Sequence, residues 1–140
     1  MKTFVSVERG LGIMADKQGE IMLSLPADKD YVLLARMVLS GLGMLAGMDV
    51  GLIDDLRTAT NECCDCLLHQ PMKAERLELR ARICDGRLYC CLNAVRSGGP
   101  SDLPPSDLEI TRGVLETLMP DVSLQSDACG VGSIGFSLPV

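Results

Sequence analysis

The chain has 140 residues, of which 47% are hydrophobic and 3% aromatic, and its formal net charge is −6. This length and hydrophobic content predict one folded domain over residues 1–140 and exclude a disordered chain. The excess of acidic residues argues against nucleic acid and against an anionic membrane surface as partners.

The N-terminus has no signal-peptide pattern, and the longest apolar stretch, residues 31–48, is interrupted by Arg36 and Ser40. We interpret this stretch as a buried helix rather than a membrane span. Without a secretion signal, the seven cysteines are expected to be reduced thiols in a cytoplasmic protein.

Two short strands are predicted near the N-terminus, at residues 3–8 and 21–25, because their side chains alternate as in a half-buried strand. Pro26 ends the second strand. We treat residues 1–19 as an N-terminal extension of the domain.

A strongly apolar helix is predicted over residues 29–46, with Asp28 as its N-cap and Gly47 at its end. Arg36 lies on the one narrow stripe of this helix that is not apolar. A helix of this kind is buried in the core or contacts a second chain.

A second helix is predicted from an N-cap at Asp49 to the residue before Pro71, with leucines, alanine and cysteines on one face. Glu62 lies about 100° around the helix from the centre of that face. It therefore lies at the edge of the buried face, close to Cys66 and His69, a position suited to a functional site.

A β-hairpin is predicted by two alternating segments, residues 77–83 and 88–95, joined by an Asp-Gly turn. With a two-residue loop, all inward side chains share one face. The predicted pairs are Ile83 with Leu88, Ala81 with Cys90, Leu79 with Leu92 and Leu77 with Ala94.

Ser106 and Glu109 have the spacing of a capping box and predict a third helix that Pro120 ends. Two further strands are predicted around residues 122–124 and 134–138. The order of elements predicts an α+β fold: a two-layer sandwich of a mixed β-sheet with helices on one face.

Three cysteines and the single histidine lie together at the end of the second predicted helix. Cys63, Cys66 and His69 follow at intervals of three residues, but a zinc site needs further ligands from another element. Cys90 and Cys91 are neighbours on a strand and point to opposite faces. We expect no metal site and interpret the cysteines mainly as small hydrophobic residues of the core. A thiol-based metal or redox sensor remains an alternative.

Residues 25–71, which include IDDLRTATNE at residues 53–62, and residues 114–125 resemble the anti-sigma-factor serine kinases, a family of GHKL, or Bergerat-fold, ATPases. The resemblance spans about residues 20–138. It implies the histidine-kinase-like ATPase fold, which is the α+β sandwich that the order of elements predicts.

The first of the three ATP-binding motifs of this family has a Glu that acts as general base and an Asn four residues later that holds magnesium. The resemblance places Glu62 and Cys66 at these positions. Residues four apart on a helix lie on the same side, which explains the spacing. A thiol is a poor ligand for a cation that prefers oxygen.

The second motif is DxGxG, whose Asp accepts a hydrogen bond from the adenine amino group. The resemblance places Ala94 at the Asp, Arg96 at the first Gly and Gly98 at the second. An alanine cannot accept this bond, and a buried donor left unpaired costs about 1–3 kcal/mol.

The third motif is a flexible lid followed by a glycine-rich helix start that surrounds the phosphates. The corresponding segment here is residues 97–106, and the helix start carries Asp107 and Glu109. Carboxylates at these two positions repel a phosphate.

The resemblance therefore implies a degenerate member that acts by binding other proteins, without a cofactor, in a partner-switching pathway of transcription regulation. The implied partners are a sigma factor, an antagonist protein, or both, with Arg36 at the partner-binding position and a homodimer as the assembly. The alternative is an active serine/threonine kinase that binds ATP and Mg²⁺ and uses Glu62 as its base.

Overall fold

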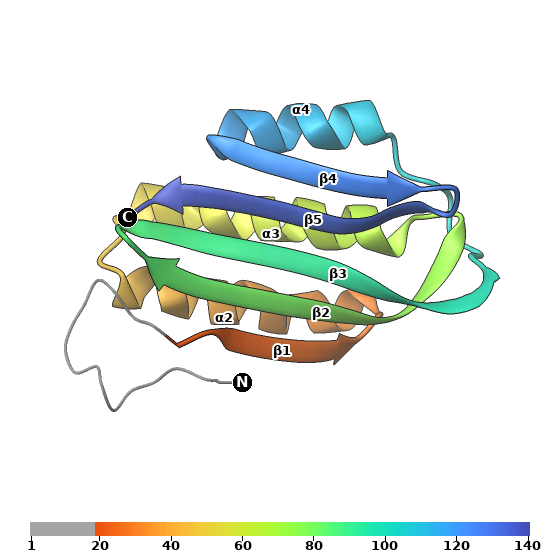
Figure 1. Ribbon diagram of the computed structural model, residues 1–140, viewed down its shortest axis with the longest axis horizontal. Helices are drawn as coiled ribbons and strands as arrows, with labels where there is room; N and C mark the ends of the chain where they lie inside the picture. Colours follow the sequence, from red (N-terminus) through yellow and green to blue (C-terminus); the bar gives the residue numbers. More distant parts are fainter. Residues whose placement is uncertain (1–18) are drawn as a thin grey trace.

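The computed structural model describes residues 19–140, which form one β-sheet with α-helices on one of its faces (Figure 1). The strand predicted at residues 3–8 lies outside the described residues. The elements are, in chain order, β1 Ile21–Pro26, the 3-10 turn η1 Lys29–Tyr31, α2 Val32–Leu45, α3 Val50–Leu68, β2 Met72–Cys84, β3 Arg87–Pro100, α4 Leu108–Leu118, β4 Asp121–Asp127 and β5 Gly130–Pro139.

The predicted α+β two-layer sandwich is confirmed, with five strands in the order β1-β2-β3-β5-β4. The prediction of a mixed sheet is wrong for residues 19–140, because every strand pairing there is antiparallel. The chain returns from β3 through α4 to β4, and β4 runs in the same direction as β3. However, β5 lies between these two strands, so that all neighbouring strands are antiparallel.

The predicted β2–β3 hairpin is confirmed in its turn and in its register. Asp85 and Gly86 have φ angles of 51° and 73°, as a type I′ turn requires. All four predicted residue pairs are present, from Ile83 with Leu88 to Leu77 with Ala94. Local turn chemistry and alternation were therefore sufficient to determine this part of the sheet.

Two of the three residues predicted as N-caps, Asp28 and Asp49, act as caps in the structure. Asp28 Oδ1 accepts from the Asp30 backbone N–H and begins η1, and Asp49 Oδ1 accepts from the Leu52 N–H at the start of α3. For α4 the prediction of Ser106 as N-cap is wrong. Asp107 is the cap, and its side chain accepts from the N–H groups of Glu109 and Ile110.

The core lies between the sheet and the helices and consists of aliphatic and cysteine side chains. All seven cysteines are free thiols. Four of them are buried in the core: Cys63, Cys64, Cys66 and Cys90. This confirms the interpretation of most cysteines as core residues. Among residues 19–140, no helix combines the length and the apolarity that crossing a membrane would require.

Candidate functional site

Helix α3 carries Glu62 and Cys66, the two residues at the positions of the first ATP-binding motif. It lies between α2 and α4 and also contacts the sheet. Glu62 is half-buried, which confirms its predicted place at the edge of the buried face, whereas Cys66 is only 1% exposed. Within the described part of the chain, no hydrogen bond or ion pair engages the Glu62 carboxylate.

The thiol of Cys66 lies in a polar cluster formed by the end of α3 and the start of α4. The Ser106 hydroxyl donates to Cys66 Sγ over 3.7 Å, and the Gln70 side-chain amide donates to the same sulfur over 3.5 Å. Burial raises the pKa of the Cys66 thiol, and hydrogen bonds from Ser106 and Thr111 act in the opposite direction. The sulfur at this position is thus already surrounded by hydrogen-bond donors of the protein itself.

Gln70 connects three parts of the chain and is 4% exposed. Its amide nitrogen donates to the Cys66 carbonyl over 2.7 Å and to the Ser106 hydroxyl over 3.2 Å. Its amide oxygen accepts from the Val131 N–H over 2.8 Å. The end of α3, the segment before α4 and the start of β5 are therefore held together by one side chain.

The segment that corresponds to the flexible lid, residues 97–106, is also bonded directly to the chain that follows α3. The Ser101 N–H donates to the Pro71 carbonyl and the Ser106 N–H donates to the His69 carbonyl, each over 2.9 Å. The Ser97 hydroxyl donates to the Lys73 carbonyl over 3.2 Å. These bonds hold the segment over the end of α3, next to Cys66.

The residues at the second motif lie at the end of β3. Ala94 is half-buried and packs against the core. Arg96 donates to Asp127 Oδ2 over 2.8 Å and to the Gly130 carbonyl over 3.0 Å. The hydrogen bond between Arg96 and Asp127 raises the pKa of Arg96 and lowers the pKa of Asp127. Gly98 keeps a positive φ of 89°.

These side chains do not fit a magnesium–nucleotide complex of the family type. Magnesium takes oxygen ligands, and position 66 offers a buried thiol with a raised pKa. The Ala94 side chain has no acceptor for an adenine amino group, and position 96, where the family motif has a glycine, carries an arginine bonded to Asp127 and to the Gly130 carbonyl. Among residues 19–140, no group of three or more His, Cys, Asp or Glu side chains is arranged to hold a metal ion.

Arg36 lies on α2, is half-buried, and has no hydrogen bond or ion pair with any other described residue. Its charge lowers the pKa of the Cys64 thiol, although burial dominates and raises that pKa to about 12. The guanidinium thus lies near α3 with its hydrogen-bonding groups available.

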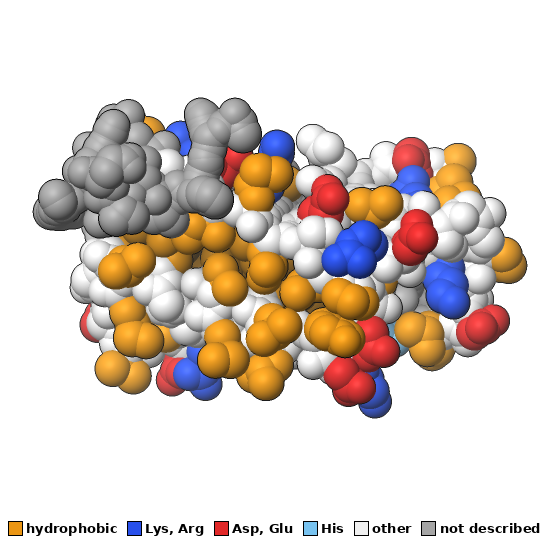
Figure 2. Space-filling view, turned by 90° about the horizontal axis from the view of Figure 1, so that it is seen from below, with side chains coloured by type: hydrophobic (Ala, Val, Ile, Leu, Met, Phe, Trp, Pro, Cys, Tyr) orange, Lys and Arg blue, Asp and Glu red, His pale blue; other side chains and the backbone are white. Residues whose placement is uncertain are grey.

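Exposed apolar side chains extend along the same helix, and Figure 2 shows hydrophobic side chains gathered on this side of the molecule. We call this the α2 surface, and it consists of Leu33, Leu34, Met37, Met44 and Leu45, which are 43–64% exposed. The sequence predicted that this helix is buried or contacts a second chain. Within residues 19–140 each of these five side chains keeps at least 43% of its surface exposed.

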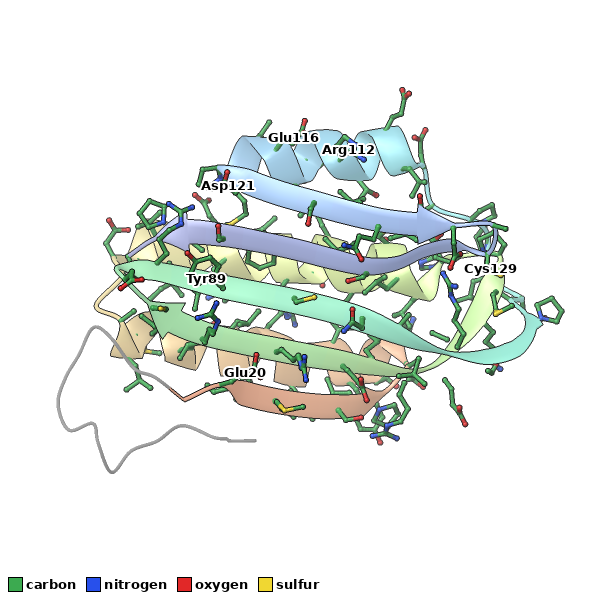
Figure 3. The ribbon with its side chains drawn as sticks, viewed as in Figure 1. Glu20, Tyr89, Arg112, Glu116, Asp121 and Cys129 are labelled. Atoms are coloured by element: carbon green, nitrogen blue, oxygen red, sulfur yellow. The ribbon has the colours of Figure 1, made fainter. Side chains whose placement is uncertain are left out.

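A second feature was missed from the sequence. The face of the sheet away from the helices has a hollow with a volume of about 480 Å³. Figure 3 shows Glu20, Tyr89 and Asp121 around it. The sequence pattern that could have indicated this hollow lies in β5, where small outward-facing residues alternate with large buried ones.

No family model matches this chain. Comparison with curated proteins, in contrast, finds several related serine-protein kinases. The serine-protein kinase RsbW of Listeria monocytogenes serovar 1/2a is 31% identical over 81% of this chain and 84% of its own length. The proteins of the same name from Listeria monocytogenes serotype 4a and Listeria innocua serovar 6a are each 30% identical, with the same coverage. The chain therefore belongs to the anti-sigma-factor serine kinase family.

Proposed function

We propose that this chain is a cytoplasmic regulatory protein that acts by binding a sigma factor or an antagonist protein, and that it does not bind ATP. The observation that carries the proposal is the hydrogen bonding of Ser106 and Gln70 to Cys66 and of Gln70 to Ser106. An active family member needs a magnesium ligand at this position and a segment that opens for the nucleotide. Here the thiol is buried, and the neighbouring segment is bonded to the end of α3.

One observation favours the alternative of an active kinase. Glu62 is half-buried, and its carboxylate has no hydrogen bond or ion pair in the described part of the chain, so it is available to accept a proton from a substrate. A thiol-based metal or redox sensor is favoured less, because burial raises the pKa of Cys63, Cys64 and Cys90 and keeps the thiolate, the reactive form, rare.

Calorimetric titration with ATP and MgCl₂ distinguishes the two main functions. We expect no binding tighter than about 1 mM, because the adenine and magnesium contacts are both missing. Micromolar binding that is lost in Glu62→Ala but kept in Asp65→Ala, an exposed carboxylate on the same helix, would support the active kinase and contradict the proposal.

The α2 surface supports both parts of the proposed protein binding. Large apolar side chains that stay exposed over one helix mark an interaction site. The unpaired guanidinium of Arg36 adds a charged group of the kind enriched at such sites. We propose that this surface holds the second copy of a homodimer and that Arg36 contacts the sigma factor or the antagonist.

Charge substitutions on α2 test this assignment. Met37→Glu places a charge on the most central exposed residue and should weaken dimerisation roughly tenfold or more in analytical ultracentrifugation. Arg36→Glu should weaken binding to purified sigma factors by a similar factor in biolayer interferometry. Asn61→Glu, an exposed position on α3, is the matched control and should change neither. Equal losses in all three variants would argue against the α2 surface.

A further inference from the structure

The sheet hollow lies on the opposite layer of the sandwich from the α2 surface and from Cys66. It is lined by side chains of β2, β3 and β4 that point away from the helices, among them Arg80, Arg82, Tyr89, Cys91, Asp121 and Ser123. Their positions alternate with core residues such as Leu79, Ala81 and Cys90. The proposed function leaves this face without a role.

The hollow exists because the middle of this face carries a glycine and short side chains. Gly135 pairs with Cys91 on one side and with Ser123 on the other. A Cβ atom at position 135 would lie 3.3 Å from Ser123 Oγ. Glycine in a strand interior weakens the strand and occurs where a ligand or another backbone approaches closely. The floor of the hollow is thus backbone and short polar groups, with taller side chains on both sides.

The tall side chains on the β2 side are two arginines without acidic partners. Arg80 and Arg82 alternate with buried residues, so both side chains leave the same face of the sheet, from Cα atoms about 7 Å apart along the strand. The Arg82 guanidinium lies 4.9 Å from the centre of the Tyr89 ring. Neither arginine forms an ion pair with a described residue, although the chain has 19 acidic residues and 13 basic ones.

The opposite side of the hollow is electrostatically neutral. Arg87 donates to Asp121 Oδ2 over 2.6 Å and to the Ser137 hydroxyl over 3.0 Å, so the Asp121 charge is compensated. Glu20 is the remaining acid at the rim; the strand register places it across from Arg82, but it forms no ion pair with Arg80 or Arg82. Counting Arg87, three arginines stand against two acids around the hollow, which gives it a net charge of +1 on a protein whose net charge is −6.

We propose that the sheet hollow docks an extended acidic segment of a partner protein. Alternate side chains of an extended chain are also about 7 Å apart, so two carboxylates two residues apart match Arg80 and Arg82. The partner backbone lies over Gly135, where no side chain obstructs it. Because the hollow is an open face of the sheet, it suits an extended chain better than an enclosed small molecule. This site is independent of the α2 surface, and one chain can hold partners on both layers.

A fluorescein-labelled decapeptide of alternating Glu and Thr is the probe, and the same peptide with Gln in place of Glu is its control. In fluorescence anisotropy the acidic peptide should bind the full chain, weaken as salt rises to about 0.15 M, and bind more tightly than the neutral peptide. Arg80→Glu with Arg82→Glu should weaken this binding roughly tenfold or more.

Arg57→Glu with Arg112→Glu is the matched control pair, because both arginines are exposed on helices of the other layer and the change in net charge is the same. This pair should leave the affinity within about twofold. Arg80→Gln with Arg82→Gln removes the two charges without reversing them, and it should also weaken the binding of the acidic peptide. Circular dichroism melting checks that each variant is folded.

Other outcomes would overturn the proposal. Absence of binding by the acidic peptide at low salt would do so, as would equal losses in both arginine pairs. Citrate and the unlabelled Glu–Thr peptide are then compared as competitors of the labelled peptide. If citrate displaces it at the same concentration as the unlabelled peptide does, the hollow binds a small anion rather than an extended segment. Self-association of the chain that is lost only in the Arg80/Arg82 variants would assign it to a second copy.

Discussion

The free energy of unfolding is expected to fall steeply as the pH rises above 9, because four buried thiols stay protonated in the folded protein. Burial raises the pKa of Cys63 and Cys90 well above the usual value of 9.0, and raises the pKa of Cys64 to about 12. The pKa of Cys66 is raised by burial as well. In the unfolded chain these thiols are exposed and ionise near pH 9.

The direction follows from the numbers of protons that the two states bind. Below pH 9 both states keep these protons, so the stability contributed by burying neutral thiols is fully present. Between pH 9 and the raised pKa values the unfolded chain binds fewer protons than the folded one, and the free energy of unfolding decreases with pH. One thiol contributes a slope of up to about 1.4 kcal/mol per pH unit. Four thiols give up to about 5 kcal/mol per pH unit, a large part of the stability of an ordinary domain.

Urea unfolding under reducing conditions at pH values from 7 to 11 measures this slope. The variant Cys84→Ser with Cys129→Ser removes two half-buried thiols and should keep the steep decline. Cys64→Ala should make the decline shallower by about one thiol's share. A free energy of unfolding that stays constant up to pH 11 would contradict the buried, protonated state of the cysteines.

Gly130→Ala is expected to lower the free energy of unfolding by about 3 kcal/mol. Gly130 has a φ of 104°, and a Cβ atom there would lie 2.5 Å from Gln70 Oε1 and 2.9 Å from Pro71 Cδ. Gln70 is buried and hydrogen-bonded at both ends of its amide, so it cannot move without breaking its bond to the Val131 N–H. The substitution thus combines backbone strain with the loss of a buried hydrogen bond.

Gly98→Ala is the matched control, because Gly98 has a φ of 89° and a Cβ atom added there would meet no atom within 4 Å. Strain alone should cost about 1–2 kcal/mol at this position. Urea unfolding gives both values, and hydrogen exchange should show faster opening of residues 101–106 in Gly130→Ala only. Similar costs in the two variants would mean that the contact with Gln70 is unimportant.

Local patterns predicted the parts of this fold that depend on neighbours in sequence. The Asp85–Gly86 turn determined the hairpin register, and Asp49 began α3 as its side-chain chemistry requires. The cap of α4 was predicted wrongly because the Ser106 hydroxyl is engaged by Gln70 and Cys66, which lie 36 and 40 residues away. No pattern in the α4 sequence reports these distant partners.

In the candidate site, too, the sequence predicted the arrangement of near neighbours but not the contacts between distant segments. Glu62 and Cys66 share one side of a helix, and their spacing alone predicted that arrangement. The hydrogen bond of Ser106 to Cys66, the ion pair of Arg96 with Asp127 and the hollow over Gly135 all join strands or segments far apart in sequence. They depend on the order of strands in the sheet, which composition and periodicity leave undetermined.

Arg96 and Gly132 constrain how this chain can change in evolution. A Cβ atom at position 132 would lie 2.9 Å from Arg96 Nη2, so the glycine provides the space that the guanidinium occupies. A glycine at position 96 would remove the guanidinium donor from Asp127, which would keep the Cys129 N–H, and from the Gly130 carbonyl, and it would leave an empty volume beside Gly132. The single step from Arg96 to the glycine of the family motif is therefore destabilising, and so is any side chain at position 132: we expect that descendants of this protein diversify at their surfaces while this pair of residues stays unchanged.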